Sequence, residues 1–363
     1  MSRITCFTVA VAAIVFTVAG CKDRVESLTG PQIVGPAMSR VGTLAAPLVP
    51  RIIEPRATDR DIDYVPAVDP QLNHHYVWLD PSARGNPKLL VFMPGANGRP
   101  ASWQFVLQEA ARLGYHVIGL MYQNNVEVVN VCGGSASPVG HSLDPDCSRN
   151  LRLEMIDGID RSNLTAVTPA NGIDNRLAKL LAYLANQFQD EGWSRFLEDD
   201  GTPKWSQIVV AGQSQGAAQA ALIGQLRHVD RVVMFSGPPD ARVPEEVDSW
   251  VFIGVTPAAK YFGLFHQRDH LVVGIRANLT ALGIDRFGAP VTVELSEPPY
   301  GETHILTTDL PPQGGYIETR PHQSTARDDR TPLGPDGTPL LRDAWRYLLR
   351  NGTQGGQNAD ADN

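Results

Sequence analysis

The sequence predicts an α/β protein in which a mostly parallel sheet carries helices on both faces. Three observations favour this fold class. Short apolar runs alternate with amphipathic helical patterns along most of the chain, which is typical of a parallel sheet covered on both sides. The 363 residues are 42% hydrophobic, which is enough to bury a full core. One apolar run also passes directly into a glycine-framed serine turn at 212–216 and then into an alanine-rich helix start.

The expected elements follow one another in an alternating order. Apolar runs bounded by turn residues predict strands at 76–80, 88–94, 115–121, 206–212, 231–237, 260–265 and 290–295. Helical patterns predict helices at 101–113, 172–189, 215–227, 271–283 and 340–350. In the helix at 172–189, spacings of three and four place on one face Ile173, Leu177, Leu180, Leu184 and Phe188.

Residues 1–20 are typical of a signal peptide. Arg3 supplies a positive start, residues 4–18 are uncharged and mostly apolar, and Val-Ala-Gly precedes Cys21. This ending resembles the cleavage site of bacterial lipoproteins, in which the cysteine carries the lipid. An ordinary signal peptide or a short uncleaved anchor remains the alternative, because the uncharged stretch is near the lower length limit for crossing a bilayer. Lys22 resembles an outer-membrane sorting pattern, so we expect an exported lipoprotein, in the outer membrane and facing the periplasm or the exterior.

Composition then divides the rest of the chain. Residues 21–70 are rich in proline and lack sustained periodicity, which indicates a semi-rigid tether between the lipid and a folded body. The body is expected over 71–350. The polar, glycine-rich tail at 351–363 is expected to be disordered.

A long polar insertion at 123–170 interrupts the alternation of strands and helices. It holds Cys132 and Cys147, which form the remaining pair once Cys6 is removed with the signal peptide and Cys21 is assigned to the lipid. In an exported chain, such a pair favours a disulfide. A metal site is the weaker interpretation, because the close second cysteine and spaced histidines of zinc sites are missing. We therefore expect a braced loop over the mouth of a site.

Charge and motifs exclude several classes of function. The formal net charge is −8 and no block of basic residues is present, which argues against a nucleic-acid partner. Neither a dinucleotide fingerprint nor a phosphate loop occurs, so no cofactor is implied. We also predict no metal site.

The segment Gly-Gln-Ser-Gln-Gly at 212–216 matches the pattern G-x-S-x-G, in the strand-turn-helix setting where that pattern works. Glycine at both ends of the pattern removes side chains that would clash with the strand and the helix. The turn is expected to raise the Ser214 hydroxyl above the carboxyl end of the sheet. The backbone N–H of Gln215 then points toward a developing oxyanion. The alternative is a purely structural role, in which the serine caps a glycine-rich helix start.

With this turn placed between a strand and a helix, the chain resembles the α/β-hydrolases from about His74 to Arg350. It is similar to a group of exported bacterial serine hydrolases. The segments that carry the resemblance are FMPGANG, LGYHVIGLMY, VVAGQSQG, RVVMFSGPPD, FHQRDH and PPYGETHILTTDLPP. The resemblance implies the α/β-hydrolase fold and hydrolysis by an activated serine. It is much less specific to a substrate.

A nucleophilic serine needs a histidine to take its proton and a carboxylate to orient that histidine. In the resembling fold the order along the chain is serine, acid, histidine. Asp269 follows the strand expected at 260–265 and is the expected acid. Asp240 follows the strand expected at 231–237 and is the alternative, because some members of the fold carry the acid one strand earlier.

For the base, His304 is expected, because it follows the strand predicted at 290–295, where the resembling enzymes place their histidine. His322 lies in a second loop and is the alternative base. By the same resemblance, the turn at 94–98 supplies the second oxyanion donor, and the N–H of Ala96 is the expected group. A simple strand-to-helix turn would also favour the glycine and asparagine found there.

Together these residues predict a membrane-anchored serine hydrolase that cleaves small carboxylic esters through an acyl-enzyme at Ser214. Two alternatives remain. The chain could be a binding lipoprotein that has kept the fold without the activity, because fold does not imply function. It could also cleave amides, because peptidases use the same machinery.

Overall fold

The computed structural model describes residues 48–66, 69, 72–83, 85–133, 144–243 and 246–350, with nothing said of the side chains of 241–246. All of these residues belong to one structural unit. The expected signal peptide at 1–20, the lipid site Cys21, the tether up to residue 47 and the tail at 351–363 lie outside the described residues. Within the described ranges, no helix is long and apolar enough to cross a membrane.

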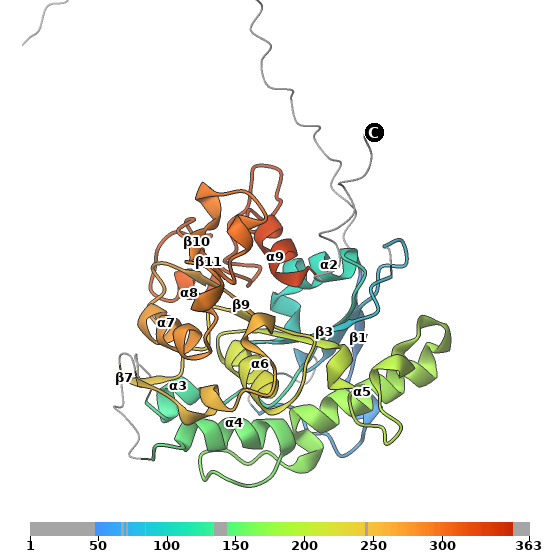
Figure 1. Cartoon of the computed structure of the whole chain (residues 1–363). Coiled ribbons are helices and arrows are strands. Elements are labelled where there is room, and N and C mark those ends of the chain that lie inside the picture. Colours follow the sequence, from blue (N-terminus) through green and yellow to red (C-terminus); the bar gives the residue numbers. More distant parts are fainter. Residues whose placement is uncertain are drawn as a thin grey trace, which may run out of the picture. The chain divides into compact units, whose positions relative to one another are not determined.

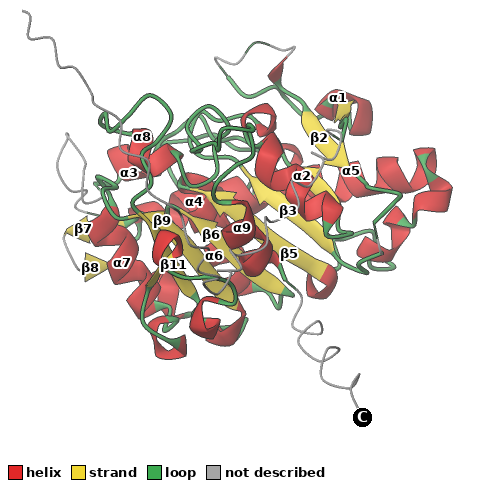
Figure 2. Ribbon diagram, turned by 90° about the horizontal axis from the view of Figure 1, so that it is seen from above, coloured by secondary structure: helices red, strands yellow, loops and turns green. Residues whose placement is uncertain are grey.

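A nine-stranded, mostly parallel sheet runs through the described part of the chain (Figures 1 and 2). The strand order is β1-β2-β4-β3-β5-β6-β9-β11-β10. Strand β2 is antiparallel to β1 and β4, and the other neighbours are parallel. The bounds, in that order, are Arg51–Ile53, His75–Trp78, His116–Gly119, Leu89–Met93, Ile208–Gln213, Arg231–Phe235, Tyr261–His266, Ile305–Thr308 and Val291–Thr292. The fold class predicted from the alternation of patterns is confirmed.

The central strands are apolar throughout because both faces of the sheet are covered. Every residue of β3, β5 and β9 is buried. Leu90 and Phe92 join one core cluster, whereas Leu89, Val91 and Met93 join the other. Alternate residues of a strand point to opposite faces, so each strand supplies both cores.

Helices lie on both faces of the sheet (Figure 2). On one face α2 and α9 contribute Leu107 and Trp345 to the core, and on the other α5, α6 and α7 contribute Leu180, Ala221 and Ile275. The bounds of these five helices are Gln104–Arg112, Arg342–Leu349, Ile173–Gln187, Gln215–Leu226 and Val272–Ala281. Each falls within a range where the sequence pattern predicts a helix. The other α-helices of the described residues are α1 (Pro55–Thr58), α3 (Val128–Val131), α4 (Cys147–Asp157) and α8 (Arg320–Gln323), and a short ribbon pairs β7 (Ala241–Val243) with β8 (Glu246–Val247).

The last part of the sheet differs from the expectation. Only Val291–Thr292 of the segment 290–295 forms a strand, and Val293–Leu295 is a 3-10 turn. The strand β11 at Ile305–Thr308 is not predicted, and it pairs with β9 on one side and β10 on the other. A run of four residues between a Pro-Tyr-Gly turn and a Pro-Pro pair is too short to show a period. This strand determines where His304, the expected base, lies in the fold.

Part of the segment 21–70, which is expected to be a tether, belongs to the folded body. Strand β1 pairs with β2, α1 begins at Pro55, and Ile62 and Val65 are buried. Proline is well suited to the first turn of a helix, since its missing N–H would have no partner there. The proline content that indicates a tether therefore also fits this first layer of the folded body.

The disulfide predicted for the insertion is present. Cys132 and Cys147 are bonded, with their Cα atoms 5.5 Å apart, and they lie 15 positions apart in the sequence. The bond joins the chain just after α3 to the first residue of α4. Closing a loop of this length stabilises the fold by about 3 kcal/mol in the chain-entropy model. It also fixes α3, which lines the cavity described below.

Candidate active site

Ser214 occupies the sharp turn between β5 and α6. Its backbone angles are φ 57° and ψ −119°, a conformation that a residue with a side chain rarely adopts. A Cβ at Gly212 would lie 2.3 Å from the carbonyl carbon of Gly216, and a Cβ at Gly216 would lie 1.9 Å from the carbonyl oxygen of Met93. The N–H of Ser214 donates to the carbonyl of Phe235 at 2.8 Å. Glycine at 212 and 216 is therefore required by the packing, as the sequence predicts.

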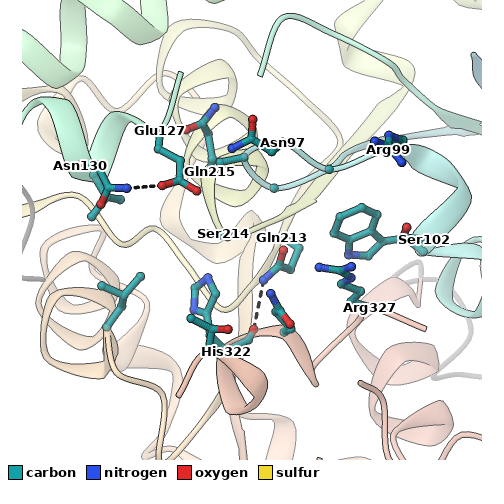
Figure 3. A pocket seen from close by; sticks show the side chains of 18 of the residues that line it. Asn97, Arg99, Ser102, Glu127, Asn130, Gln213, Ser214, Gln215, His322 and Arg327 are labelled. Atoms are coloured by element: carbon teal, nitrogen blue, oxygen red, sulfur yellow. Dashed lines mark hydrogen bonds between the residues drawn. The ribbon is translucent and has the colours of Figure 1, made fainter. Parts of the chain in front are cut away.

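The turn opens on a cavity of about 510 Å³ that Ser214 helps to line (Figure 3). The walls come from segments far apart in the chain: the turn after β3, the helix α3, the start of α7 and the region around α8. Most of the lining side chains are polar. They include Asn97, Arg99, Ser102, Glu127, Asn130, Gln213, Gln215, His270, His322, Gln323 and Arg327.

Asp269 and His322 meet at this cavity. The Nδ1 atom of His322 lies 2.7 Å from Oδ2 of Asp269, and both side chains are almost fully buried. The other carboxylate oxygen of Asp269 accepts the N–H of Leu271 at 2.9 Å. With Nδ1–H donated to the carboxylate, Nε2 of His322 is left as a proton acceptor. Figure 3 shows the His322 imidazole directed toward the region of Ser214.

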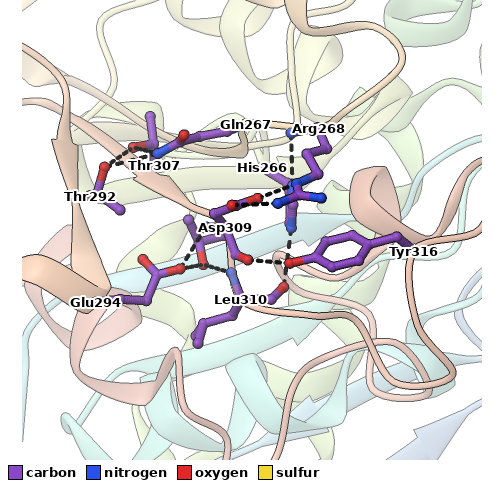
Figure 4. Close-up of polar contacts among 10 residues, drawn as sticks. His266, Gln267, Arg268, Thr292, Glu294, Thr307, Asp309, Leu310 and Tyr316 are labelled. Carbon is purple, nitrogen blue, oxygen red and sulfur yellow. Dashed lines mark hydrogen bonds and ion pairs between the residues drawn. The ribbon is translucent and has the colours of Figure 1, made fainter.

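A network of polar contacts supports the loop that carries Asp269 (Figure 4). His266 accepts the N–H of Arg268 at Nδ1 (2.9 Å), and its Nε2 lies 3.1 Å from the carbonyl oxygen of Leu310. Arg268 pairs with Asp309 through two contacts of 2.7 and 2.9 Å. Burial lowers the pKa of His266, so its ring stays neutral and can keep both bonds. His266 therefore holds the chain just before Asp269.

The expected base His304 lies elsewhere. It directly precedes β11, beside the amino-terminal end of β9, where its Nδ1 lies 3.0 Å from the carbonyl oxygen of Tyr261. Its ring stacks on Phe262 and Phe287, at centroid distances of 4.0 and 4.3 Å. Ser214 and Asp269 follow the carboxyl ends of their strands, so the structure brings His322 to Asp269 and leaves His304 at the opposite edge. The unpredicted strand β11 causes this difference.

The alternative acid Asp240 has another role. Its carboxylate forms a buried ion pair with Arg152, in which Nη2 lies 2.5 Å from Oδ1, and it accepts the Ser148 hydroxyl at 3.1 Å. Arg152 also donates from Nη1 to the carbonyl of Gln215 at 3.2 Å. The ion pair thus ties α4 to the first residue of α6. Sequence reasoning missed Arg152, because a helix with several charged residues gives no sign of which of them is buried.

The turn expected to supply the second oxyanion donor lies beside Ser214. Gly95 packs so closely on Gln213 that a Cβ there would lie 2.7 Å from its Oε1 atom. The side chain of Asn124 donates to the carbonyls of Gly95 and Gly98, both at 2.9 Å. These bonds hold the turn from behind, while Ala96 lines the cavity. Asn124 is a second supporting residue that the sequence pattern does not reveal.

One group of side chains in the described residues has the composition of a metal site. Ligand atoms of Asp269, His270 and His322 all lie within 4.8 Å of one another. Two ligands of a tetrahedral zinc ion would lie roughly 3.3 Å apart, given metal-ligand bonds of about 2 Å. The 2.7 Å between Asp269 and His322 is instead a hydrogen-bond distance. The group fits a hydrogen-bonded pair with a neighbouring histidine better than a metal centre.

The strand order, the antiparallel β2 and the serine turn after β5 together define the α/β-hydrolase fold. No protein-family model matches the sequence, and no curated protein matches it significantly. Solved structures of similar fold include a bacterial heroin esterase, with 13% identity, 84% of this chain and 86% of that chain covered, and a TM-score of 0.38. An esterase from Thermogutta terrifontis has 13% identity, coverages of 72% and 81%, and a TM-score of 0.32. Esterase B from Lactobacillus rhamnosis has 12% identity, coverages of 70% and 79%, and a TM-score of 0.33. Structural similarity this weak does not indicate an activity. The function has to be inferred from the site.

The stacked position of His304 predicts a pH dependence of stability. Burial lowers the pKa of His304 to about 4, so the folded chain resists its protonation, whereas the unfolded chain titrates it near the ordinary value. The contribution of His304 is therefore complete above pH 6.5 and is lost as the pH falls toward 4. We expect the His304→Phe variant, which cannot titrate, to lose less free energy of unfolding than the wild type over this range. Urea unfolding at pH 7.5 and pH 4.5 measures the difference, and equal losses in both proteins would contradict the assignment.

Proposed function

We propose that this protein is a serine hydrolase that cleaves carboxylic esters through an acyl-enzyme at Ser214. One observation carries the proposal. A serine with a positive φ, at the carboxyl end of a central strand, lines the same cavity as a histidine that is hydrogen-bonded to a buried carboxylate. Nucleophile, base and orienting acid are the three parts that acyl transfer by serine requires.

In the proposed first step, Oγ of Ser214 attacks the ester carbonyl while Nε2 of His322 takes the hydroxyl proton. Asp269 keeps the imidazole in the tautomer with a proton on Nδ1 and stabilises the imidazolium that forms. His322 then gives the proton to the leaving alcohol as the ester C–O bond breaks. In the second step, a water molecule loses a proton to His322 and attacks the acyl-enzyme. His322 then returns this proton to Oγ of Ser214 as the acyl C–O bond breaks, which releases the acid and restores Ser214.

The developing oxyanion is proposed to accept hydrogen bonds from the backbone N–H groups of Ala96 and Gln215. Both residues line the cavity next to Ser214. The N–H of Gln215 also stands at the first turn of α6, where the helix dipole favours negative charge. Loss of one such donor typically costs about 3 kcal/mol of transition-state stabilisation. Arg152 and Asn124 act as positioning residues, because they hold the backbone that carries these donors.

A covalent probe tests the proposal directly. We expect a fluorophosphonate to label the mature protein at Ser214 and to leave the Ser214→Ala variant unlabelled, because only an activated serine reacts rapidly. His322→Ala should lower kcat on p-nitrophenyl butyrate by about 10³-fold or more. His304→Phe is the matched control and should keep most of the activity, because its ring lies at the other edge of the sheet. Peptide mapping by mass spectrometry and steady-state kinetics provide the two measurements.

Labelling at another residue, or a His304→Phe variant as inactive as His322→Ala, would contradict the proposed roles. The same enzyme preparations assayed on p-nitrobutyranilide separate an esterase from an amide-cleaving enzyme. Turnover of the ester without turnover of the anilide is the expected result. A protein that resists the probe and cleaves neither compound is better described as a binding protein of the same fold.

We further propose that the mature protein is an exported lipoprotein anchored through Cys21 in the outer membrane. The motivating features are the small residues before that cysteine, Lys22 after it, and a disulfide that suits an oxidising compartment. In a Gram-negative host, the wild type should incorporate labelled palmitate and sediment with outer-membrane fractions. The Cys21→Ser variant should do neither. Palmitate incorporation that persists in the variant would refute this site.

A further inference from the structure

One wall of the active-site cavity carries a guanidinium group without an ion-pair partner. Arg99 comes three residues after Ala96 and lines the cavity, and its buried Nε makes no hydrogen bond. Among the residues that the structure describes, none of the carboxylates forms an ion pair with Arg99. The side chain of Arg99 is partly exposed, and its buried Nε atom is shielded from water without a hydrogen-bond partner, which costs free energy. In a chain of net charge −8, such a group in a cavity calls for a functional explanation.

A second arginine lines the same cavity. Arg327 has a contact of 2.8 Å with Asp329, whose carboxylate is 47% exposed, so water screens that pair strongly. The adjacent Asp328 accepts the backbone N–H groups at the start of α2, at 2.9 and 3.0 Å, and its charge also acts on Arg327, although the two side chains form no ion pair. In Figure 3, Arg327 and Arg99 lie on the side of the cavity marked by Ser102. Both guanidinium groups therefore remain able to bind an anion.

The rest of the cavity agrees with an anion at this wall. Trp103 also lines the cavity, and its buried Nε1 atom has no hydrogen-bond partner. Glu127 supplies the carboxylate among the residues that line the cavity. It lies on the side opposite the two arginines, where it pairs with the amide of Asn130 (Figure 3). An anionic group is repelled by Glu127 and attracted by the arginines, which fixes how a substrate would lie across Ser214.

We propose that the preferred substrates are esters with an anionic group, a carboxylate or a phosphate, which is bound by Arg99 and Arg327. This inference rests on the proposed esterase function and names its substrate class. Guanidinium groups bind carboxylates and phosphates through paired, charge-assisted hydrogen bonds, and this geometry gives selectivity as well as affinity. Few apolar side chains line the cavity, chiefly Trp103, Val129 and Leu271, so a long acyl chain finds little surface to bury.

Two matched pairs of esters test the proposal. Mono-p-nitrophenyl adipate carries a carboxylate on the acyl side, and methyl p-nitrophenyl adipate is its neutral counterpart. On the alcohol side, 4-butyryloxybenzoate is compared with its methyl ester. We expect the anionic member of at least one pair to have a kcat/KM about tenfold higher than that of its neutral partner. An effect of this size is typical of one hydrogen bond to a charged group. Because the attraction is electrostatic and the cavity is open to water, the preference should fall as salt is added.

Substitutions assign the preference to the arginines. In Arg99→Gln, the ratio of kcat/KM for the anionic over the neutral ester should fall about tenfold. Arg276→Gln is the matched control, since Arg276 lies on α7 in a different pocket, and it should keep the wild-type ratio. A wild-type ratio of one or less in both pairs would overturn the inference, and so would an unchanged ratio in Arg99→Gln.

A binding measurement separates failure of this inference from failure of the esterase function. Adipate or 4-hydroxybenzoate should protect Ser214 of the wild type from the fluorophosphonate, and Arg99→Gln should need about tenfold more of the same anion. If the wild type is labelled at Ser214 and cleaves the neutral esters, but neither anion protects it, the anion site is refuted while the esterase proposal stands. If Ser214 resists the probe altogether, both proposals fail.

Discussion

The tight bend at 212–216 is the steric constraint on which the rest of the site depends. Ser214 adopts a positive φ in this bend, and Gly216 lies so close to the carbonyl of Met93 that even a methyl group would overlap it. Such a strained turn persists only where packing and hydrogen bonds from the surrounding structure hold it in place. Here they do so through the neighbouring parallel strands β3 and β6, because β3 supplies the carbonyl that packs on Gly216 and β6 supplies the carbonyl that accepts the Ser214 N–H.

The same close packing joins the bend of Ser214, the proposed nucleophile, to the turn at 94–98, which is proposed to supply an oxyanion donor. Gly95 contacts Gln213 within the distance that glycine alone allows, so the turn after β3 and the turn after β5 are held against each other. Arg152 and Asn124, which both lie in the insertion at 123–170, then fix the backbone around the two turns. The insertion is thus part of the site, because its disulfide fixes α3 and α4, one of which lines the cavity while the other carries Arg152.

Sequence patterns predict what depends on local periodicity and on glycine sterics. The βα alternation gives the fold class, and the glycine frame of Ser214 and the position of Asp269 after a buried strand follow from local patterns. The choice between His304 and His322 does not, because it depends on the four-residue strand β11, whose pairing with β9 is a long-range contact without a local signal. For the same reason β1, paired across the chain with β2, is hidden in a proline-rich segment. The proposed positioning role of Arg152 cannot be recognised in the sequence, because it depends on contacts with Asp240 and with the carbonyl of Gln215.

The central claim is that the bend presents the Ser214 hydroxyl to His322 on one side and to two backbone N–H groups on the other. A crystal structure of the mature protein after reaction with diethyl p-nitrophenyl phosphate tests this geometry most directly. The account predicts phosphorus bonded to Oγ of Ser214, the phosphoryl oxygen within hydrogen-bonding distance of the N–H groups of Ala96 and Gln215, and Nε2 of His322 near Oγ. An adduct on another residue, or a phosphoryl oxygen that points away from both N–H groups, would contradict it.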